Sequence, residues 1–460
     1  MHTARPSKEE HAVLPPEATT ASLSARIDRV PTTRRHLVWI SILGLAYFIE
    51  IFDNISFSFV APSVRADLGL DLSEVGLVIS AVFVGALIGA VLGGRLSDRF
   101  GRRPVLIISC IVFSIGSLIS AVSPTWEILA LSRVVTGLGM QAAVGVLLVI
   151  VSELFPRLVR GRFFAALTFV GFVSSPVTAV IALNIVPASP GAWRWVFAIG
   201  GLGIIVAILV AFLVPETVHW QEAHGRTEAA SRTVNVLEAA ALKSGAQLSE
   251  PEVSSFDSGK RGTLRELLRG EALRRLVVTA LAFSIYLYCL YGLSAWIPTI
   301  LTDRGMTETA ALQFMTVLSL GQILGPLALF FVADRVQRKT VIFIGSIVTA
   351  AALVWFALTA DPTLSLISAF IAYLAATSMT TPFYTYIPEV FSTSLRGMGV
   401  GIVNGMGRVA GVLSGVTIAA IYTAWGFEVM YLILAGIFLL TGTIVMVFGI
   451  RTTQQSLDNI

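Results

Sequence analysis

Twelve long apolar segments constrain the fold of this chain more than any other feature. They cover roughly residues 37–61, 75–94, 104–122, 126–151, 163–186, 193–214, 274–300, 309–332, 340–359, 363–387, 398–423 and 427–450. An α-helix needs about 20 apolar residues to cross the hydrocarbon core of a bilayer. Only 13% of the residues are charged, against about 25% in soluble domains. The sequence therefore predicts an all-α membrane protein with twelve transmembrane helices.

A polar stretch between the sixth and seventh apolar segments divides the chain into two halves. We expect an N-terminal tail at 1–36, six-helix halves at 37–214 and 274–450, a linker at 215–273 and a C-terminal tail at 451–460. Amphipathic pieces such as "TLRELLRGEALRRL" favour a partly helical linker along the membrane surface. A flexible tether is the alternative.

The basic residues indicate which side of the membrane each loop faces. With an even number of spans, both termini and the linker lie on one side, and that side carries most of the 32 Lys and Arg residues. Loops on the other side hold only Arg65, Arg194 and Arg304. Because Lys and Arg are enriched in cytoplasmic loops, we expect cytoplasmic termini and a multi-pass protein of the inner (plasma) membrane. The net charge of +4 then reflects topology, and no nucleic-acid partner is expected.

The placement of cysteine and histidine argues against metal chemistry. Cys110 and Cys289 lie in apolar segments, and the five histidines lie outside them. These positions lack the spacing of a metal site or a disulfide framework. We therefore expect no metal, no cofactor and no enzymatic activity.

The two halves repeat each other at a constant offset. "GRLSDRFGRR" after the second span returns as "FFVADRVQRK" after the eighth, and "SELFPRLVRG" after the fourth returns as "PEVFSTSLRG" after the tenth. The same shift relates Pro62, at the end of the first span, to Pro298, at the end of the seventh. The chain therefore reads as a parallel duplication about an axis along the membrane normal, with a cavity expected between the halves near the midplane.

These motifs resemble those of the major facilitator superfamily of secondary transporters. "GRLSDRFGRR" at 94–103 is similar to the superfamily's signature between helices 2 and 3, and "LSRVVTGLGMQAA" at 131–143 to its fourth-helix pattern. The resemblance covers all twelve spans. It implies alternating access, with spans 1, 4, 7 and 10 around the cavity.

Charged residues and glycines at the span ends of these motifs are candidate gating residues. They could latch the two halves together when the cavity faces outward; the alternative is that they only fix topology. The candidates are Gly94, Asp98, Arg99, Gly101, Arg102, Arg103, Glu153, Arg160, Asp334, Arg335, Arg338, Glu389 and Arg396.

Four ionisable residues remain deep within the spans: Glu50, Asp53, Arg133 and Arg408. A charge at the centre of a bilayer costs about 3 kcal/mol or more, so such residues usually face a bundle interior or a wet cavity and pair with opposite charges. Their presence indicates either a transport site or a structural ion pair between helices.

The stretch "EIFD" at 50–53 resembles the acid-x-x-acid motif in the first helix of the aromatic acid:proton symporter family. That family usually has Asp-Gly-x-Asp, whereas Glu50 and Ile51 occupy the first two positions here. Its other functional charges fall on Arg133, Glu153, Arg396 and Arg408, and "VPET" at 214–217 also suits it.

The chemistry of these residues suits a proton-coupled transporter of anions. Two nearby carboxylates in a site of low dielectric disfavour double ionisation and titrate as a pair, so Glu50 and Asp53 are the candidate proton carriers. An arginine stays charged, and its planar fork can hold a carboxylate with two hydrogen bonds. The candidate substrate-binding residues are Arg133, Arg408, Asn54, Gln141, Tyr288, Tyr291 and Asn404.

The function favoured by the sequence is proton-coupled uptake of an organic carboxylate, preferably aromatic. The expected partners are a small organic anion, protons and the lipid bilayer, and the protein is expected to be a monomer. A sugar or polyol porter and a drug/proton antiporter are alternatives, although "GFVSSPVTAV" at 171–180 lacks the glycines that antiporters carry in the fifth span. A membrane sensor without transport is the remote alternative.

Overall fold

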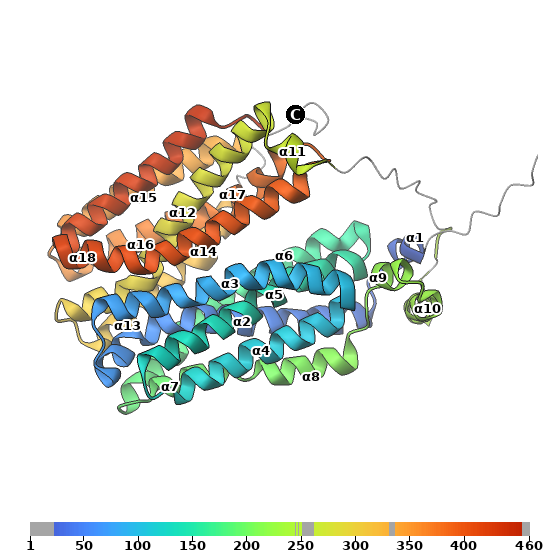
Figure 1. The fold of residues 1–460 in the computed structure, drawn as a ribbon, viewed down its shortest axis with the longest axis horizontal. Coiled ribbons are helices and arrows are strands. Elements are labelled where there is room, and N and C mark those ends of the chain that lie inside the picture. The colour runs from blue at the N-terminus through green and yellow to red at the C-terminus, as the bar shows by residue number, and fades with distance from the viewer. Residues whose placement is uncertain (1–22, 244, 247, 251–261, 331–335, 453–460) are drawn as a thin grey trace, which may run out of the picture.

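The computed structural model describes residues 23–243, 245–246, 248–250, 262–330 and 336–452. It contains two helical bundles that lie side by side along their length (Figure 1). The end of the bundles that carries the linker is called the linker end below, and the opposite end is called the far end. Two of the predicted gating residues, Asp334 and Arg335, lie outside the described residues.

The N-terminal bundle contains six spans. They are α2 (Arg34–Leu68), α3 (Leu72–Phe100), α4 (Arg102–Val122), α5 (Trp126–Leu154), α6 (Arg157–Ile185) and a sixth span that is divided into α7 (Trp193–Gly200) and α8 (Gly203–Leu213). A single turn of 3-10 helix, η1 (Val186–Ala188), follows α6.

The C-terminal bundle supplies the other six spans. They are α12 (Gly270–Asp303), α13 with α14 (Glu308–Ser319 and Gly321–Phe330), α15 (Arg338–Leu358), α16 with α17 (Pro362–Ser378 and Thr380–Glu389), and α18 (Arg396–Phe448). The 53-residue α18 contains the last two spans, because Gly426 leaves helical geometry at φ 76° and ψ −174° and bends the chain back. The predicted twelve-helix fold with two six-helix halves is confirmed.

Short helices outside the spans gather at the linker end. They are α1 (Leu23–Asp28), α9 (Val218–Ala223), α10 (Thr227–Lys243) and α11 (Leu264–Leu267). Figure 1 shows α1, α9 and α10 beside the end of the N-terminal bundle. Arg26 of α1 and Arg29, which directly follows α1, both pair with Glu238 of α10, at 2.6 and 2.7 Å, so the linker helix is held to the segment that precedes the first span.

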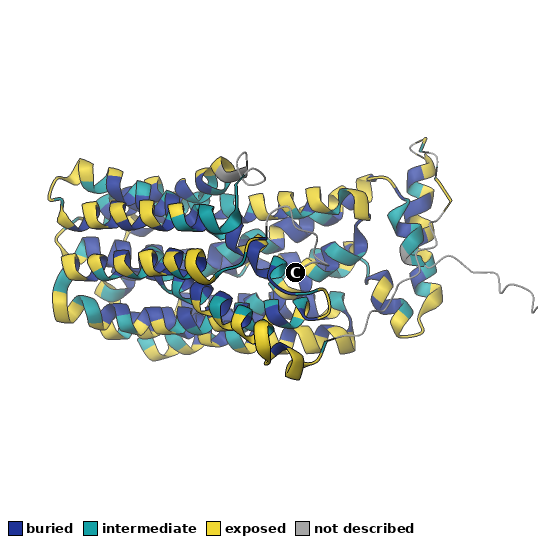
Figure 2. Cartoon of the chain, turned by 90° about the horizontal axis from the view of Figure 1, so that it is seen from above, coloured by how far each residue is buried: buried dark blue, intermediate teal, exposed yellow. Residues whose placement is uncertain are grey.

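Several helices extend beyond their apolar segments. Pro62 and Pro298, at the ends of their apolar segments, lie inside α2 and α12, which continue to Leu68 and Asp303. The helices continue because only the lipid-crossing part of a span must be apolar, and polar residues prolong it into the interface. Apolar side chains such as Ile108, Leu131 and Phe169 are exposed, as expected where lipid replaces water. Exposed residues recur along the helices on the outside of the molecule (Figure 2).

Glycines set the approach of α3 to two other helices. A Cβ atom on Gly85 or Gly89 would collide with the backbone of α5 at Val134 or Leu138, so α3 and α5 pack closely within one half. Nearer the far end, Gly76 of α3 lies against Gly415 of α18 in the other half. Small residues allow such close packing between helices in lipid, and here they do so both inside one half and between halves.

The two halves are joined by polar contacts in the part of the bundles nearer the far end. Among the described residues, Arg65 pairs with Asp303 at 2.7 Å, Ser63 donates to Glu308, and the Ser80 hydroxyl donates to the Val412 carbonyl at 2.7 Å. The two bundles diverge toward the linker end (Figure 1). The structure is therefore closed at its far end.

Candidate transport site

A buried ion pair joins the first and fourth spans. The Arg133 guanidinium donates from Nη1 to Oδ2 of Asp53 at 2.9 Å and from Nη2 to the Asp53 carbonyl at 3.0 Å. The two side chains are 1% and 0% exposed. Because α2 and α5 present these groups to each other inside one half, each charge has its counter-charge within the bundle.

Two further residues complete the surroundings of this pair. The Ser117 hydroxyl of α4 lies within hydrogen-bond distance of Oδ1 of Asp53 and 2.8 Å from the Phe197 carbonyl. The guanidinium also lies over the Phe197 ring, 5.4 Å from its centroid. Since the hydroxyl has one proton, it can donate to only one of these acceptors at a time. The sequence analysis did not identify Ser117 as a site residue. Its only distinguishing feature in the sequence is that it is a polar residue in an apolar span.

A central cavity of about 110 Å³ lies between the two halves. Arg133 reaches its wall from the N-terminal half, and Tyr291 reaches it from the C-terminal half. Gln322 and Tyr373 also line it and are hydrogen-bonded to each other at 2.8 Å. The rest of the wall is mainly apolar and includes Phe83, whose ring lies 4.5 Å from that of Tyr291. The cavity thus offers one guanidinium, a few neutral polar groups and aromatic faces.

Glu50 faces a second, smaller void of about 10 Å³. Its side chain is buried, and its Oε2 has no hydrogen-bond partner among the described residues. Arg408 lines the same void from the other half and donates from Nη1 to the Tyr291 hydroxyl at 2.9 Å. Glu50 and Arg408 therefore lie on opposite sides of the interface between the halves, around the same void, and do not form an ion pair with each other in the structure described.

The structure brings together most of the predicted substrate-binding residues. Asn54 lines both cavities, Gln141 lines the smaller one and Tyr291 lines the central one. Two others lie outside both walls: the Tyr288 hydroxyl bonds to Thr417 at 2.7 Å, and the Asn404 amide bonds to the Val400 carbonyl of its own helix at 2.9 Å. Gln322 and Tyr373 were not predicted, because nothing in their local sequence distinguishes them from other polar residues in spans.

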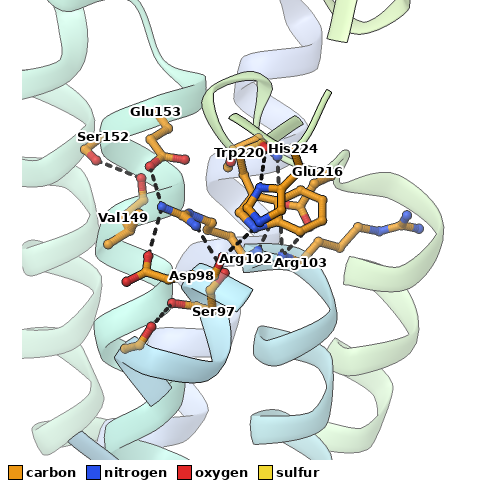
Figure 3. A network of polar contacts seen from close by, with 12 residues as sticks. Ser97, Asp98, Arg102, Arg103, Val149, Ser152, Glu153, Glu216, Trp220 and His224 are labelled. Carbon is orange, nitrogen blue, oxygen red and sulfur yellow. Dashed lines mark hydrogen bonds and ion pairs between the residues drawn. The ribbon is translucent and has the colours of Figure 1, made fainter. Parts of the chain in front are cut away.

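A polar network at the linker end contains several of the predicted gating residues (Figure 3). Arg102 pairs with Asp98 and with Glu153, each at 3.2 Å, and donates to the Ser97 carbonyl at 3.1 Å. These contacts connect α3, α4 and α5 within the N-terminal half. In this conformation these contacts therefore connect helices within the N-terminal half and do not join the two halves.

Glu216, just after the sixth span, is a member of this network that was not predicted as a site residue. Its carboxylate accepts from the backbone N–H groups of Arg102 at 3.0 Å and Arg103 at 3.2 Å, at the start of α4. Gly101 (φ 107°) makes room, since a Cβ there would strike the carboxylate. Burial raises the pKa of Glu216, and these N–H donors act against the rise. Trp220 donates to the Asp98 carbonyl at 2.9 Å, which ties the linker to the same corner.

The remaining gating candidates are more scattered. Arg99 lies over the Phe100 ring, and Gly94 has open space where a Cβ would point. Arg160 donates to the Phe155 carbonyl at 3.2 Å. In the C-terminal half, Arg338 lies 3.7 Å from Glu389, and Arg396 donates to Thr393 at 3.3 Å.

The fold and the site define the class of the protein. Two six-helix halves around a central cavity that carries buried charges are the architecture of a secondary transporter of the major facilitator type. The model of the family described as "Sugar (and other) transporter" matches residues 39–460. The chain belongs to this family, whose members are transporters rather than enzymes.

Three characterised or named relatives align over almost the whole chain. The putative metabolite transport protein YyaJ of Bacillus subtilis is 30% identical, over 94% of this chain and 96% of its own. The niacin transporter NiaP of Acinetobacter baylyi is 26% identical, over 95% and 99%. The 4-hydroxybenzoate transporter PcaK of the same organism is 26% identical, over 90% and 91%.

Among solved structures, the fold is similar to that of a D-xylose-proton symporter. The TM-score is 0.74 at 18% sequence identity, and the match covers 91% of this chain and 99% of the symporter. At this identity the likeness establishes the fold alone.

The buried Asp53–Arg133 pair predicts that removing one partner lowers the free energy of unfolding more than removing both. Asp53→Asn should lower the free energy of unfolding by about 3–5 kcal/mol, because it leaves the Arg133 charge buried and unpaired. Asp53→Asn with Arg133→Gln should restore part of the loss. Arg65→Gln, which breaks a pair that is about 30% exposed, should cost no more than about 1 kcal/mol. Thermal or denaturant unfolding of purified protein measures all three, and a double mutant no more stable than Asp53→Asn would contradict the expectation.

Proposed function

We propose that the protein takes up an organic carboxylate, preferably aromatic, together with protons. The observation that carries this proposal is the position of Arg133, whose guanidinium is bound to Asp53 and also reaches the wall of the central cavity. A carboxylate in the cavity and the carboxylate of Asp53 are then alternative partners for one planar fork. Protonation of Asp53 would weaken its hold on Arg133 and leave the guanidinium free for the substrate.

The proposed coupling has a favourable balance of energy. Moving one negative charge inward against 100 mV costs about 2.3 kcal/mol, and one accompanying proton cancels that charge. Each unit of pH difference then contributes about 1.36 kcal/mol to uptake. Glu50, buried opposite Arg408, is the second proton-carrying candidate in this scheme, and its unpartnered Oε2 leaves it able to bind a proton.

The preference for an aromatic substrate rests on the cavity wall and on the relatives. Phe83, Tyr291 and Tyr373 line the same cavity as the guanidinium, and aromatic rings suit a flat substrate ring that carries a carboxylate. NiaP is named for niacin and PcaK for 4-hydroxybenzoate.

A sugar or polyol is the second candidate substrate. The family description includes sugars, and the structural neighbour carries xylose. Asn54, Gln322 and Tyr373 could bind hydroxyl groups. The Arg133 guanidinium in the wall favours the carboxylate, because a neutral sugar has no negative charge to pair with it.

Transport assays in liposomes separate these candidates. We expect counterflow of 4-hydroxybenzoate or nicotinate and none of xylose. Arg133→Lys should reduce carboxylate counterflow at least tenfold, because a point charge cannot reproduce the two-pronged contact. Asp53→Asn should abolish accumulation driven by a pH gradient while exchange survives. Xylose counterflow with no carboxylate transport, or pH-driven accumulation by Asp53→Asn, would contradict the proposal.

We further propose that the linker end and both termini face the cytoplasm. The concentration of basic residues there supports this orientation. The far end is closed by the Arg65–Asp303 pair and its neighbours, so the state described would be the one that faces inward.

Cysteine labelling tests the orientation directly, since Cys110 and Cys289 are both buried. Exposed Ser189, beyond α6 at the far end, and exposed Ala239, on α10, are suitable positions. In intact cells, a membrane-impermeant maleimide should label Ser189→Cys and not Ala239→Cys. After the cells are broken open, both should react. The reverse pattern in intact cells would overturn the orientation.

A further inference from the structure

A third cavity, of about 320 Å³, lies at the linker end of the N-terminal half, away from the transport site. It is formed where α2 and α4 begin, where α8 ends, and along one face of α10. Small-molecule sites typically have volumes of roughly 300–1,000 Å³, so this cavity is large enough for a headgroup-sized ligand. Transport as proposed above makes no use of it.

The cavity is lined by three arginines and no carboxylate. They are Arg35 of α2, Arg103 of α4 and Arg232 of α10. Arg35 is exposed and makes no ion pair with the described residues. Arg103 has a buried Nε without a hydrogen-bond partner among them. The Arg103 guanidinium also donates from Nη2 to the Ala211 carbonyl. Three guanidinium groups from three helices therefore line one space, and a guanidinium has five N–H donors, more than these contacts use.

The nearby acids leave this positive charge largely uncompensated. Glu228 lies 3.6 Å from Arg232, but the two side chains are 90% and 77% exposed, and such pairs are weak. The Glu216 carboxylate accepts from the backbone N–H groups at the start of α4. The cavity thus suits an anion with several acceptor oxygens, of which a phosphate is the natural example.

The other side of the cavity is apolar and faces the lipid. Phe212, at the end of the sixth span, is 83% exposed, and Leu213 beside it is 48% exposed. Trp39 is buried in the cavity wall and donates from its indole to the Leu213 carbonyl at 2.9 Å. Exposed apolar side chains next to arginines at the end of a span mark the boundary between hydrocarbon and headgroups.

We propose that this cavity binds the phosphate of an anionic phospholipid from the leaflet on the linker side. Arg35, Arg103 and Arg232 would hold the phosphate, and an acyl chain would lie against Phe212 and Leu213. Basic pockets beside transmembrane helices are suited to anionic headgroups. A soluble phosphate would contact the arginines alone, whereas a lipid would also cover the exposed apolar surface. The presence of that apolar surface beside the arginines favours the lipid. Because the cavity joins α10 to α2, a bound lipid would also fasten the linker to the N-terminal half.

Native mass spectrometry of the delipidated full-length protein tests the proposal. Phosphatidylglycerol and phosphatidylcholine with identical acyl chains are titrated against wild type and Arg35→Gln/Arg232→Gln. Both substituted side chains are exposed, so folding should not suffer. We expect wild type to prefer phosphatidylglycerol and the double variant to bind it roughly 30-fold more weakly, from the contribution of two arginines near an anionic headgroup.

A matched control removes the same charge elsewhere on the same side. Arg265, in α11, and Arg269, just before α12, are exposed and lie outside the cavity. Arg265→Gln/Arg269→Gln should keep the wild-type preference. An equal loss in the two double variants, or an unchanged preference in Arg35→Gln/Arg232→Gln, would overturn the proposal.

A third arm identifies the source of the phosphate. Glycerol phosphate carries the headgroup chemistry without acyl chains. It should fail to displace phosphatidylglycerol even at about 1,000 times the concentration of the lipid. Displacement at equal concentration would show a site for a soluble anion and would overturn the assignment to lipid.

Discussion

The pairing of Asp53 with Arg133 is the interaction on which the rest of this transporter depends. It places two full charges inside a helical bundle with almost no exposure, and a buried pair of this kind is tolerated only when its hydrogen bonds are satisfied. Ser117 and the Asp53 carbonyl supply those bonds. The same guanidinium borders the central cavity, so any anion that enters, and any proton that reaches Asp53, acts on one shared group. Coupling in this scheme needs no long-range pathway, because the two ligands compete at neighbouring atoms.

The surrounding architecture permits this group to meet opposite sides of the membrane in turn. Each half is packed tightly within itself, as the contact of Gly85 and Gly89 with α5 shows. Between the halves, the Arg65–Asp303 pair at the far end is about 30% exposed, and exposed pairs contribute at most about 1 kcal/mol. Rigid halves with weak terminal contacts can rock about a central site at small energetic cost. At the linker end, where the two halves diverge, the Arg102 network then holds the helices of the N-terminal half together.

The sequence allowed the fold to be predicted almost completely, because span length, charge placement and the repeat are local or periodic properties. The four intramembrane charges were equally visible, since each interrupts an apolar run. Their pairing was not predictable. Glu50 and Asp53 share one face of α2, yet Asp53 binds Arg133 within its half and Glu50 faces Arg408 in the other. Such choices depend on how α2 is rotated against its neighbours. Ser117, Glu216 and Gln322 were missed for the same reason, because their roles arise from partners distant in sequence.

Proton uptake on substrate binding tests the central claim most directly. Calorimetric titration of the purified protein with 4-hydroxybenzoate or nicotinate, in buffers of different ionisation enthalpy, gives the number of protons taken up for each substrate bound. The competition for Arg133 predicts net proton uptake by the wild type that is lost in Asp53→Asn while binding persists. Binding without proton uptake in the wild type across the pH range, or unchanged uptake in Asp53→Asn, would contradict the account.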